Sequence, residues 1–196
     1  MLPTLVWKLQ LQPTFRAALD PRILGVLESM RRDRPAAGEG WQSATTLHEQ
    51  EALRELVACV DHAARSVLRF LRVGDDALQI TGCWATVLAR GAAHRLHSHP
   101  NNFLSAVYYV RVHPGADTIN FHDPRAQTGI IRPPVAALTA ENTDQVVVRI
   151  TDGTLLLFPS WLQHSVDAST AERERISVSF NLMFPSFAEH LAKPLW

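Results

Sequence analysis

The period of the apolar pattern changes at Gly74, and this change limits the folds open to the chain more than any other feature. Before Gly74, apolar residues recur every three or four positions, which is typical of helices with one buried face. After it, apolar and polar residues alternate through most of the chain, which favours strands. The predicted strands cover residues 78–88, 94–99, 104–112, 118–121, 145–150, 154–158 and 175–182. Because no helical crossovers separate them, they cannot form a parallel sheet, and a sandwich or jelly roll is expected.

Two helices are expected before this change of period. Asp20 can cap the first helix, and Pro21 suits its first turn because a proline there loses no helical hydrogen bond. Thr46 and Glu49 form a capping box for a longer helix with one apolar stripe. Gly74 is the residue that ends this second helix.

The chain is expected to form one domain. Its 196 residues, 46% of them hydrophobic, are enough to build a sizeable core without disulfides or metals as staples. Residues 1–77 would supply a first strand, over residues 5–11, and the helical support. Residues 78–182 would form the core of a barrel, and residues 183–196 a C-terminal tail. A segment rich in Pro, Ala and Thr, residues 132–144, interrupts the alternation and suggests an insertion or a lid over a site.

Charge and cysteine content exclude several partners. Nineteen basic residues balance nineteen acidic ones, so no net field attracts nucleic acid or an anionic membrane. No apolar run reaches the ~18 residues of a membrane span, and the start of the chain lacks the pattern of a secretory signal. Cys59 and Cys83 match no disulfide or zinc spacing, which favours a reducing compartment. We therefore expect a cytoplasmic protein. The sequence leaves the oligomeric state open, with a homodimer among the alternatives.

Residues 97–102, with the sequence His-Ser-His-Pro-Asn-Asn, carry the most informative side chains. On a strand, His97 and His99 would project from the same face and could ligate one metal ion. His164, at the end of an apolar strand, would supply a third nitrogen, although a core or capping histidine is the alternative. Three neutral imidazoles suit Fe(II), Zn(II), Ni(II) or Cu(II) rather than Mg(II) or Ca(II). Alternation would turn His94 away from the pair.

A second group of polar residues follows His164 on the last predicted strand. Arg175, Ser177, Ser179 and Asn181 share one face of that strand, opposite an apolar face. The guanidinium of Arg175 offers a planar fork for a carboxylate, and Ser177 can add a hydrogen bond. An edge strand with a solvated polar face is the alternative. Arg173 lies nearer the loop, where solvation is expected.

These motifs resemble a known family. The spacing of His97-x-His99, His164 and Arg175-x-Ser177 is similar to the His-x-Asp, His and Arg-x-Ser pattern of Fe(II)/2-oxoglutarate dioxygenases. The sequence resembles a bacterial subgroup of 2-oxoglutarate-Fe(II) oxygenases more closely still, over most of the chain. The matching stretches are Gly-Trp-Gln-Ser at 40–43, residues 97–110, Asp-Pro-Arg at 123–125, residues 156–166 and residues 175–181.

The resemblance implies a fold and an activity. The fold is a double-stranded β-helix, which is a jelly roll of the cupin-like type, so the fold class is α+β and mainly β with the N-terminal helices packed outside. His97, His99 and His164 would bind Fe(II), and Arg175 with Ser177 would bind the distal carboxylate of 2-oxoglutarate. The reaction would hydroxylate a small-molecule or peptide substrate that the sequence does not identify.

One ligand departs from the wider pattern, because His99 stands where the superfamily has a carboxylate. Three neutral ligands would leave the charge of the metal uncompensated until an anionic co-substrate binds. Asp123 could supply a carboxylate from another strand, but a residue before a proline at a turn more often has a structural role. Of Tyr108 and Tyr109, alternation places only one inside, and the sequence does not say which.

Two other readings remain. A cupin-like metal protein would bind a small ligand without 2-oxoglutarate, and the spacings from Gly91 to His97 and from Gly153 to His164 partly fit its two motifs. In a non-enzymatic binding module the histidines would be structural. The pair Arg175 and Ser177 distinguishes the oxygenase from the cupin-like protein, because a cupin does not need it.

Overall fold

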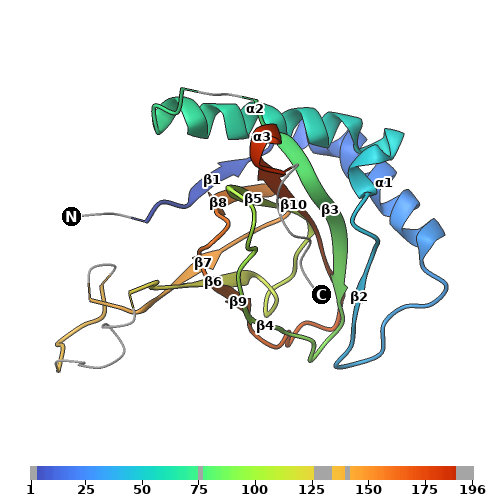
Figure 1. Ribbon diagram of the computed structural model, residues 1–196. Coiled ribbons are helices and arrows are strands. Elements are labelled where there is room, and N and C mark those ends of the chain that lie inside the picture. Colours follow the sequence, from blue (N-terminus) through green and yellow to red (C-terminus); the bar gives the residue numbers. More distant parts are fainter. Residues whose placement is uncertain (1–3, 75–76, 126–133, 140–141, 189–196) are drawn as a thin grey trace.

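The computed structural model describes residues 4–74, 77–125, 134–139 and 142–188 as two facing antiparallel sheets, with the helices on one outer face (Figure 1). The six-stranded sheet has the order β1 (Trp7–Gln10), β8 (Thr154–Pro159), β5 (Leu104–Arg111), β10 (Arg175–Met183), β3 (Gln79–Leu88), β2 (Gly40–Gln42). The four-stranded sheet has the order β4 (His94–His97), β9 (His164–Val166), β6 (Thr118–His122), β7 (Gln145–Arg149). The predicted jelly roll is therefore confirmed, as two open sheets rather than a closed barrel.

The first helix begins earlier than the sequence predicts. Helix α1 spans Pro13–Met30, with Pro13 in its first turn and Pro21 inside it. Asp20 caps nothing, because its carboxylate accepts a hydrogen bond from the hydroxyl of Tyr108 at 2.5 Å and pairs with Arg16 at 3.1 Å. The prediction of a helix start at Asp20 was wrong because this carboxylate has a tertiary partner.

The second helical region also differs at its start. Short 3₁₀ turns, η1 (Leu47–Glu49) and η2 (Glu51–Leu53), precede helix α2 (Arg54–Phe70), and a last turn, α3 (Pro185–Ala188), follows β10. The side chain of Thr46 makes no cap, so the predicted capping box is absent. Thr46 instead forms a bridge with Cys83 of β3, and the carbonyl of Thr45 accepts the Cys83 N–H at 2.7 Å. These bonds hold the chain against the sheet before the helix can begin.

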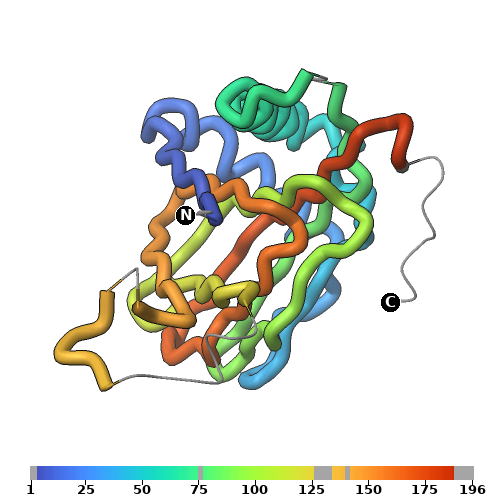
Figure 2. The backbone as a smooth tube through the Cα atoms, turned by 60° about the vertical axis from the view of Figure 1, so that its left-hand side comes forward, coloured from blue at the N-terminus to red at the C-terminus, as the bar shows by residue number. Residues whose placement is uncertain are grey.

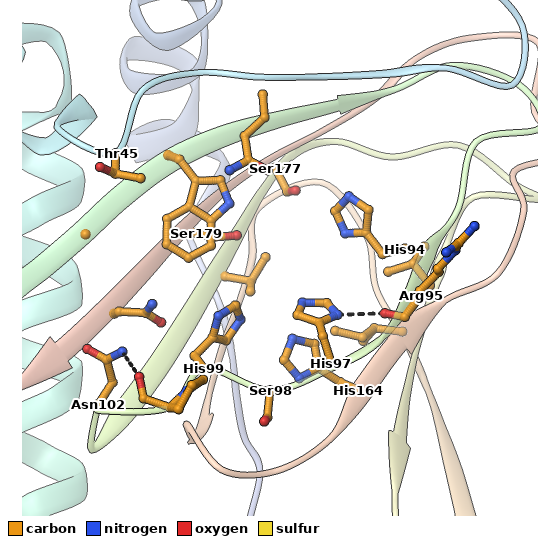
Figure 3. Close-up of a pocket in the computed structure, with 18 of the residues that line it drawn as sticks. Thr45, His94, Arg95, His97, Ser98, His99, Asn102, His164, Ser177 and Ser179 are labelled. Carbon is orange, nitrogen blue, oxygen red and sulfur yellow. Dashed lines mark hydrogen bonds between the residues drawn. The ribbon is translucent and has the colours of Figure 1, made fainter. Parts of the chain in front are cut away.

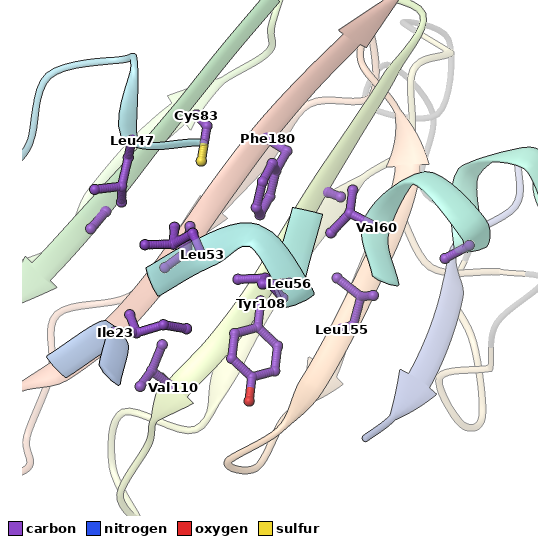
Figure 4. Close-up of a cluster of buried hydrophobic side chains, with 14 of the residues drawn as sticks. Ile23, Leu47, Leu53, Leu56, Val60, Cys83, Tyr108, Val110, Leu155 and Phe180 are labelled. Carbon is purple, nitrogen blue, oxygen red and sulfur yellow. The ribbon is translucent and has the colours of Figure 1, made fainter. Parts of the chain in front are cut away.

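The main hydrophobic core lies between the helices and the six-stranded sheet (Figure 4). One side of α1 and of α2 packs against every second residue of β3, β5, β8 and β10. Among the fully buried side chains of this layer are Ile23, Leu53, Leu56, Val60, Ala85, Tyr108, Leu155, Val178 and Phe180. Burying one such large apolar side chain stabilises the fold by about 1.5–3 kcal/mol. The packing of the N-terminal helices outside the sheets is thus as predicted.

A second core lies between the two sheets and uses the alternate residues of the same strands. Tyr109 on β5 and Phe158 on β8 face the four-stranded sheet, where Phe121 packs on Phe158 with ring centroids 5.0 Å apart. Tyr108 and Tyr109 therefore point to opposite sides of the sheet. The inward tyrosine is Tyr109.

The edges of the structure add three observations. β1 and β2, both from the first 77 residues, are the edge strands of the six-stranded sheet, so that segment supplies strands as well as support. Of the predicted insertion at 132–144, residues 134–139 form an exposed loop that projects from the body (Figure 2), and residues 132–133 and 140–141 lie outside the described residues. Among the described helices, none has the length and apolar character needed to cross a membrane.

Candidate metal centre and adjoining cavity

Three imidazoles meet between the two sheets. His97 is the last residue of β4, and His164 opens β9, which pairs with β4 so that these two residues are direct partners. His99 lies beyond the end of β4, where its N–H donates to the carbonyl of Ser160 at 2.8 Å. The predicted trio is brought together, although His99 is not on a strand and His164 begins a strand instead of ending one.

The three rings lie close enough to converge on one ion (Figure 3). The ring centroids of His97 and His164 are 4.3 Å apart, and His99 lies 5.1 Å from each of the others. One nitrogen from each ring lies within 4.8 Å of the other two. Among the described residues, this is the one group of three or more His, Cys, Asp or Glu side chains with such spacing.

Backbone carbonyls orient two of the rings. Nδ1 of His97 lies 2.7 Å from the carbonyl oxygen of Arg95, and Nδ1 of His164 lies 2.9 Å from that of Leu162. A carbonyl oxygen can only accept, so each Nδ1 carries the proton and each Nε2 keeps a free lone pair. The second nitrogen of a metal-binding histidine is usually held by a hydrogen bond of this kind.

Burial keeps the rings of His99 and His164 neutral. It lowers the pKa of His164 to about 3 and that of His99 to about 4, and in both cases the neighbouring His97 adds to the effect. His164 is only 4% exposed. A neutral imidazole is the form that ligates a metal.

Arg175 occupies another wall of the same space. Its side chain is buried at 3% exposure, and Nη1 donates to the carbonyl of Thr118 at 3.1 Å. Its Nε finds no hydrogen-bond partner among the described residues, and no described carboxylate pairs with it. The guanidinium carbon lies 5.1 Å from the ring centroid of Tyr109. Arg173, the competing candidate, is exposed, as expected.

Tyr109 adds a second unpaired polar group beside Arg175. Its ring is fully buried, and its hydroxyl finds no partner with hydrogen-bond geometry among the described residues. Burial raises the pKa of Tyr109, while the guanidinium of Arg175 acts in the opposite direction. Because a buried polar group without a partner costs about 1–3 kcal/mol, the Tyr109 hydroxyl and Nε of Arg175, on neighbouring side chains, indicate a place for a ligand.

His94 also faces this space, contrary to the sequence prediction. Its ring lies 6.0 Å from that of His97, and it lines the same cavity. The pairing of β4 with β9 shifts between His94 and His97, so simple alternation fails there. Burial lowers the pKa of His94 to about 4, with smaller effects from His97 and Arg175.

Asp123 takes no part in the histidine centre. Its carboxylate binds the guanidinium of Arg125, with Nε to Oδ1 at 2.9 Å, and lies outside the group of potential ligands. This contact with Arg125 lowers the pKa of Asp123. The structural reading of Asp123 is the one that the contacts support.

The centre opens into a cavity of about 1240 Å³. The polar face predicted for the last strand lines it, with Arg175, Ser177, Ser179 and Asn181 in succession along β10. The solvated-edge alternative for this strand is wrong, because β10 is paired on both sides, to β3 and β5. Trp84 of β3 lines the cavity as well, and no motif in the sequence marks it as functional.

The sequence and the fold both have recognisable relatives. Residues 82–181, just over half of the chain, match the family described as "Putative 2OG-Fe(II) oxygenase". No curated protein sequence matches the chain.

Solved structures share its fold at low sequence identity. The non-heme α-ketoglutarate-dependent carbocyclase SnoK from nogalamycin biosynthesis is 16% identical, with a TM-score of 0.67 over 92% of this chain and 80% of that one. A prolyl-4-hydroxylase from Pseudomonas putida is 16% identical, with a TM-score of 0.65 over 92% and 93%. HygX from Streptomyces hygroscopicus, crystallised with nickel and 2-oxoglutarate, is 12% identical, with a TM-score of 0.63 over 93% and 83%.

Proposed function

Because the chain belongs to the 2OG-Fe(II) oxygenase family, and is therefore an enzyme that uses Fe(II) and 2-oxoglutarate, we propose that His97, His99 and His164 bind the iron. We further propose that Arg175 and Ser177 bind the distal carboxylate of 2-oxoglutarate. One observation carries the proposal: a buried arginine without a described carboxylate partner lines the same cavity as three converging imidazoles.

The donor set fits a divalent transition metal. Imidazole nitrogens suit Fe(II), whereas Ca(II) and Mg(II) prefer oxygen ligands. The commonest iron site of this kind has two histidines and one carboxylate, and here His99 replaces the carboxylate. The protein then contributes no negative charge to the metal, so an anionic co-substrate has to balance it. We expect the uncompensated charge of the metal to strengthen the chelation of 2-oxoglutarate.

The end of the cavity around Arg175 fits a carboxylate. Arg175 would present its free N–H groups to one or both oxygens, and a charge-assisted bond of this type is stronger than a neutral one. The hydroxyl of Ser177, the next residue on the same face, lines the same cavity and would add a further bond. The unpaired hydroxyl of Tyr109 would gain a partner in the same step. A carboxylate would thus satisfy atoms that the protein alone leaves without partners.

Iron and 2-oxoglutarate, when bound, would supply the oxidising chemistry, in which one atom of dioxygen enters 2-oxoglutarate as it becomes succinate and carbon dioxide, and the other atom hydroxylates a substrate C–H bond. The protein would orient the metal ligands and shield the site from water. The bonds from His97 to Arg95 and from His164 to Leu162 fix which ring nitrogen faces the cavity. Apolar side chains, among them Leu88 and Ile119, keep water from the Arg175 end and strengthen electrostatic attraction there.

A cupin-like binder that does not use 2-oxoglutarate is the second reading. It gives no reason to bury Arg175 without a carboxylate partner, since an unpaired buried charge is costly. We therefore favour the oxygenase. Its proposed substrate is a small molecule or a peptide, and its proposed location is the cytoplasm; the oligomeric state is open, with a homodimer among the alternatives.

Conversion of 2-oxoglutarate tests the proposal. Protein loaded anaerobically with Fe(II) and then exposed to air is expected to form succinate slowly, even without the primary substrate. His164→Ala should abolish this conversion, whereas His62→Ala, which changes an exposed histidine of α2, should not. If iron-loaded wild type neither binds nor converts 2-oxoglutarate, the cupin-like reading replaces the oxygenase.

A further inference from the structure

The cavity continues past the histidine centre, on the side away from Arg175. Four side chains of β10 mark its length, and Arg175 and Asn181 are about 20 Å apart because a strand rises about 3.3 Å per residue. The ring of His99 lies 5.5 Å from that of Trp84, and Trp84 is the cross-strand partner of Ser179. In Figure 3, Ser179, Thr45 and Asn102 lie on one side of the histidines, and His94 and Arg95 on the other. We call the space around Trp84, Ser179 and Asn181 the outer subsite.

A buried relay of hydroxyls fixes the amide of Asn181. The hydroxyl of Ser105 donates to Oδ1 of Asn181 at 2.9 Å, and it also lies 2.9 Å from the hydroxyl of Ser160. Since a hydroxyl has one proton to give, Ser160 must donate to Ser105. Ser105 and Ser160 are 1% and 0% exposed, so water does not compete for these bonds. The Nδ2 donors of Asn181, which have no partner among the described residues, remain available to a ligand in the cavity.

Trp84 gives the outer subsite a flat wall. A Cβ atom on Gly82 would lie 3.6 Å from the indole, so the ring extends over this glycine. Gly82 is also the cross-strand partner of Asn181. The indole of Trp84 and the amide of Asn181 are therefore neighbours on the same face of the sheet. An aromatic face of this kind binds the C–H face of a ring, and the amide beside it binds that ring's oxygens.

The outer subsite carries no charge among the described residues. Its side chains offer only hydroxyl and amide groups, and no described carboxylate lines any part of the cavity. Of the two lining arginines, Arg95 lies on the other side of the histidines (Figure 3), and Arg175 stands at the opposite end of the β10 row. The polar side chains are Gln42, Thr45, Gln79, Thr81, Asn101, Asn102, Ser179 and Asn181. A charged group buried here would lack a counter-ion, which disfavours charged substrates.

Much of the strand edge in this region is already paired, which leaves little of it for an extended peptide. The outer edge of β3 is covered by β2, with Gly40 paired to Leu88, and then by Thr45, which accepts the N–H of Cys83. Peptides that bind by adding a strand need an exposed edge with free N–H and C=O groups. The partners offered instead are scattered side chains that can both donate and accept, as hydroxyl groups require.

From these observations we propose that the outer subsite binds a neutral, polyhydroxylated ring, a glycosyl unit of the substrate, stacked on Trp84 and held by Asn181. The proposal rests on the proposed function, because it takes the Arg175 end to be filled by 2-oxoglutarate. It places the C–H face of this ring beside His99, and so next to the metal centre.

Ligand-observed saturation-transfer NMR tests the proposal on protein loaded with Zn(II) and 2-oxoglutarate. The probes are methyl glycosides of glucose, galactose and mannose, with methyl glucuronide, glucosamine and an N-acetylated tripeptide amide as comparisons. We expect transfer from the protein to the ring protons of at least one neutral glycoside. Affinity should fall about tenfold in Trp84→Leu and in Asn181→Leu. Trp161→Leu, which changes an exposed tryptophan outside the cavity, is the matched control and should behave as wild type.

Metal content and 2-oxoglutarate affinity, measured on the same variants, report whether each one is folded. Ser105→Ala, which frees the amide of Asn181 without reaching the cavity, should also weaken glycoside binding if the relay orients that amide. Arg175→Ala should lose 2-oxoglutarate and keep the glycoside, which separates this inference from the proposed function. The inference is overturned by a lack of transfer to every neutral glycoside, by equal affinity in wild type and Trp84→Leu, or by preference for the tripeptide or a charged sugar.

Discussion

Replacement of Arg175 by alanine should abolish tight binding of 2-oxoglutarate while leaving the metal in place. Arg175 is 3% exposed, so solvent screens its attraction for a carboxylate only weakly. Truncating one partner of a buried, hydrogen-bonded charge pair typically costs about 2–5 kcal/mol. At 1.4 kcal/mol per factor of ten, the lower bound corresponds to roughly a thirtyfold loss of affinity.

Anaerobic titration of the Fe(II) protein with 2-oxoglutarate measures this loss through the absorption band that forms when the ligand chelates iron. Wild type should saturate, and Arg175→Ala should saturate only at concentrations at least about thirtyfold higher. Arg173→Ala, on the exposed side of the same segment, is the control. Arg175→Lys should recover only part of the affinity, because an ammonium group lacks the planar fork. Equal affinity in wild type and Arg175→Ala would refute the assignment of this end of the cavity.

Three further substitutions test the two tyrosines and one turn. Tyr109→Phe should weaken 2-oxoglutarate binding, yet raise the free energy of unfolding by about 1 kcal/mol, because it removes a buried hydroxyl that has no described partner; a large loss of stability in urea would contradict this. Tyr108→Phe should instead lower that free energy by about 2 kcal/mol, since its hydroxyl donates to the carboxylate of Asp20, and should leave the 2-oxoglutarate titration unchanged. Gly153→Ala should lower the melting temperature, through a cost of about 1–3 kcal/mol, because Gly153 has a φ of +80° and an added Cβ would meet Arg16; an unchanged melting temperature would count against the turn.

The fold could be predicted from the sequence where one physical pattern dominates. The change of period at Gly74 predicted the sheets, and the alternation along Arg175, Ser177 and Asn181 predicted which side chains line the cavity. Predictions from short sequence motifs were wrong where the polar side chain of the motif bonds to a residue distant in the sequence. Asp20 looked like a helix cap, but its carboxylate binds Tyr108, whose place in the fold no short-range pattern reveals.

The histidine centre could be predicted only in part, for a similar reason. The spacing of His97 and His99 indicated a pair of ligands. The strand that was predicted to carry both histidines, however, ends at His97. The inward direction of His94 depends on a shift in the pairing of β4 with β9, and no residue type announces such a shift. Trp84 belongs to the cavity because the register of β3 with β10 places it opposite Ser179, and the sequence does not specify that register.

Metal content is the most direct test of the central claim, which is that three imidazoles, from β4, from β9 and from the segment that follows β4, form one metal site. Elemental analysis after Fe(II) loading and gel filtration should give one metal ion per chain for wild type and for His62→Ala. His97→Ala, His99→Ala and His164→Ala should each retain a small fraction of it, since two imidazoles hold a divalent ion weakly without an anionic ligand. His99→Asp should keep the metal, because a carboxylate there restores the commoner ligand set. Equal metal content in wild type and all three alanine variants would contradict the account.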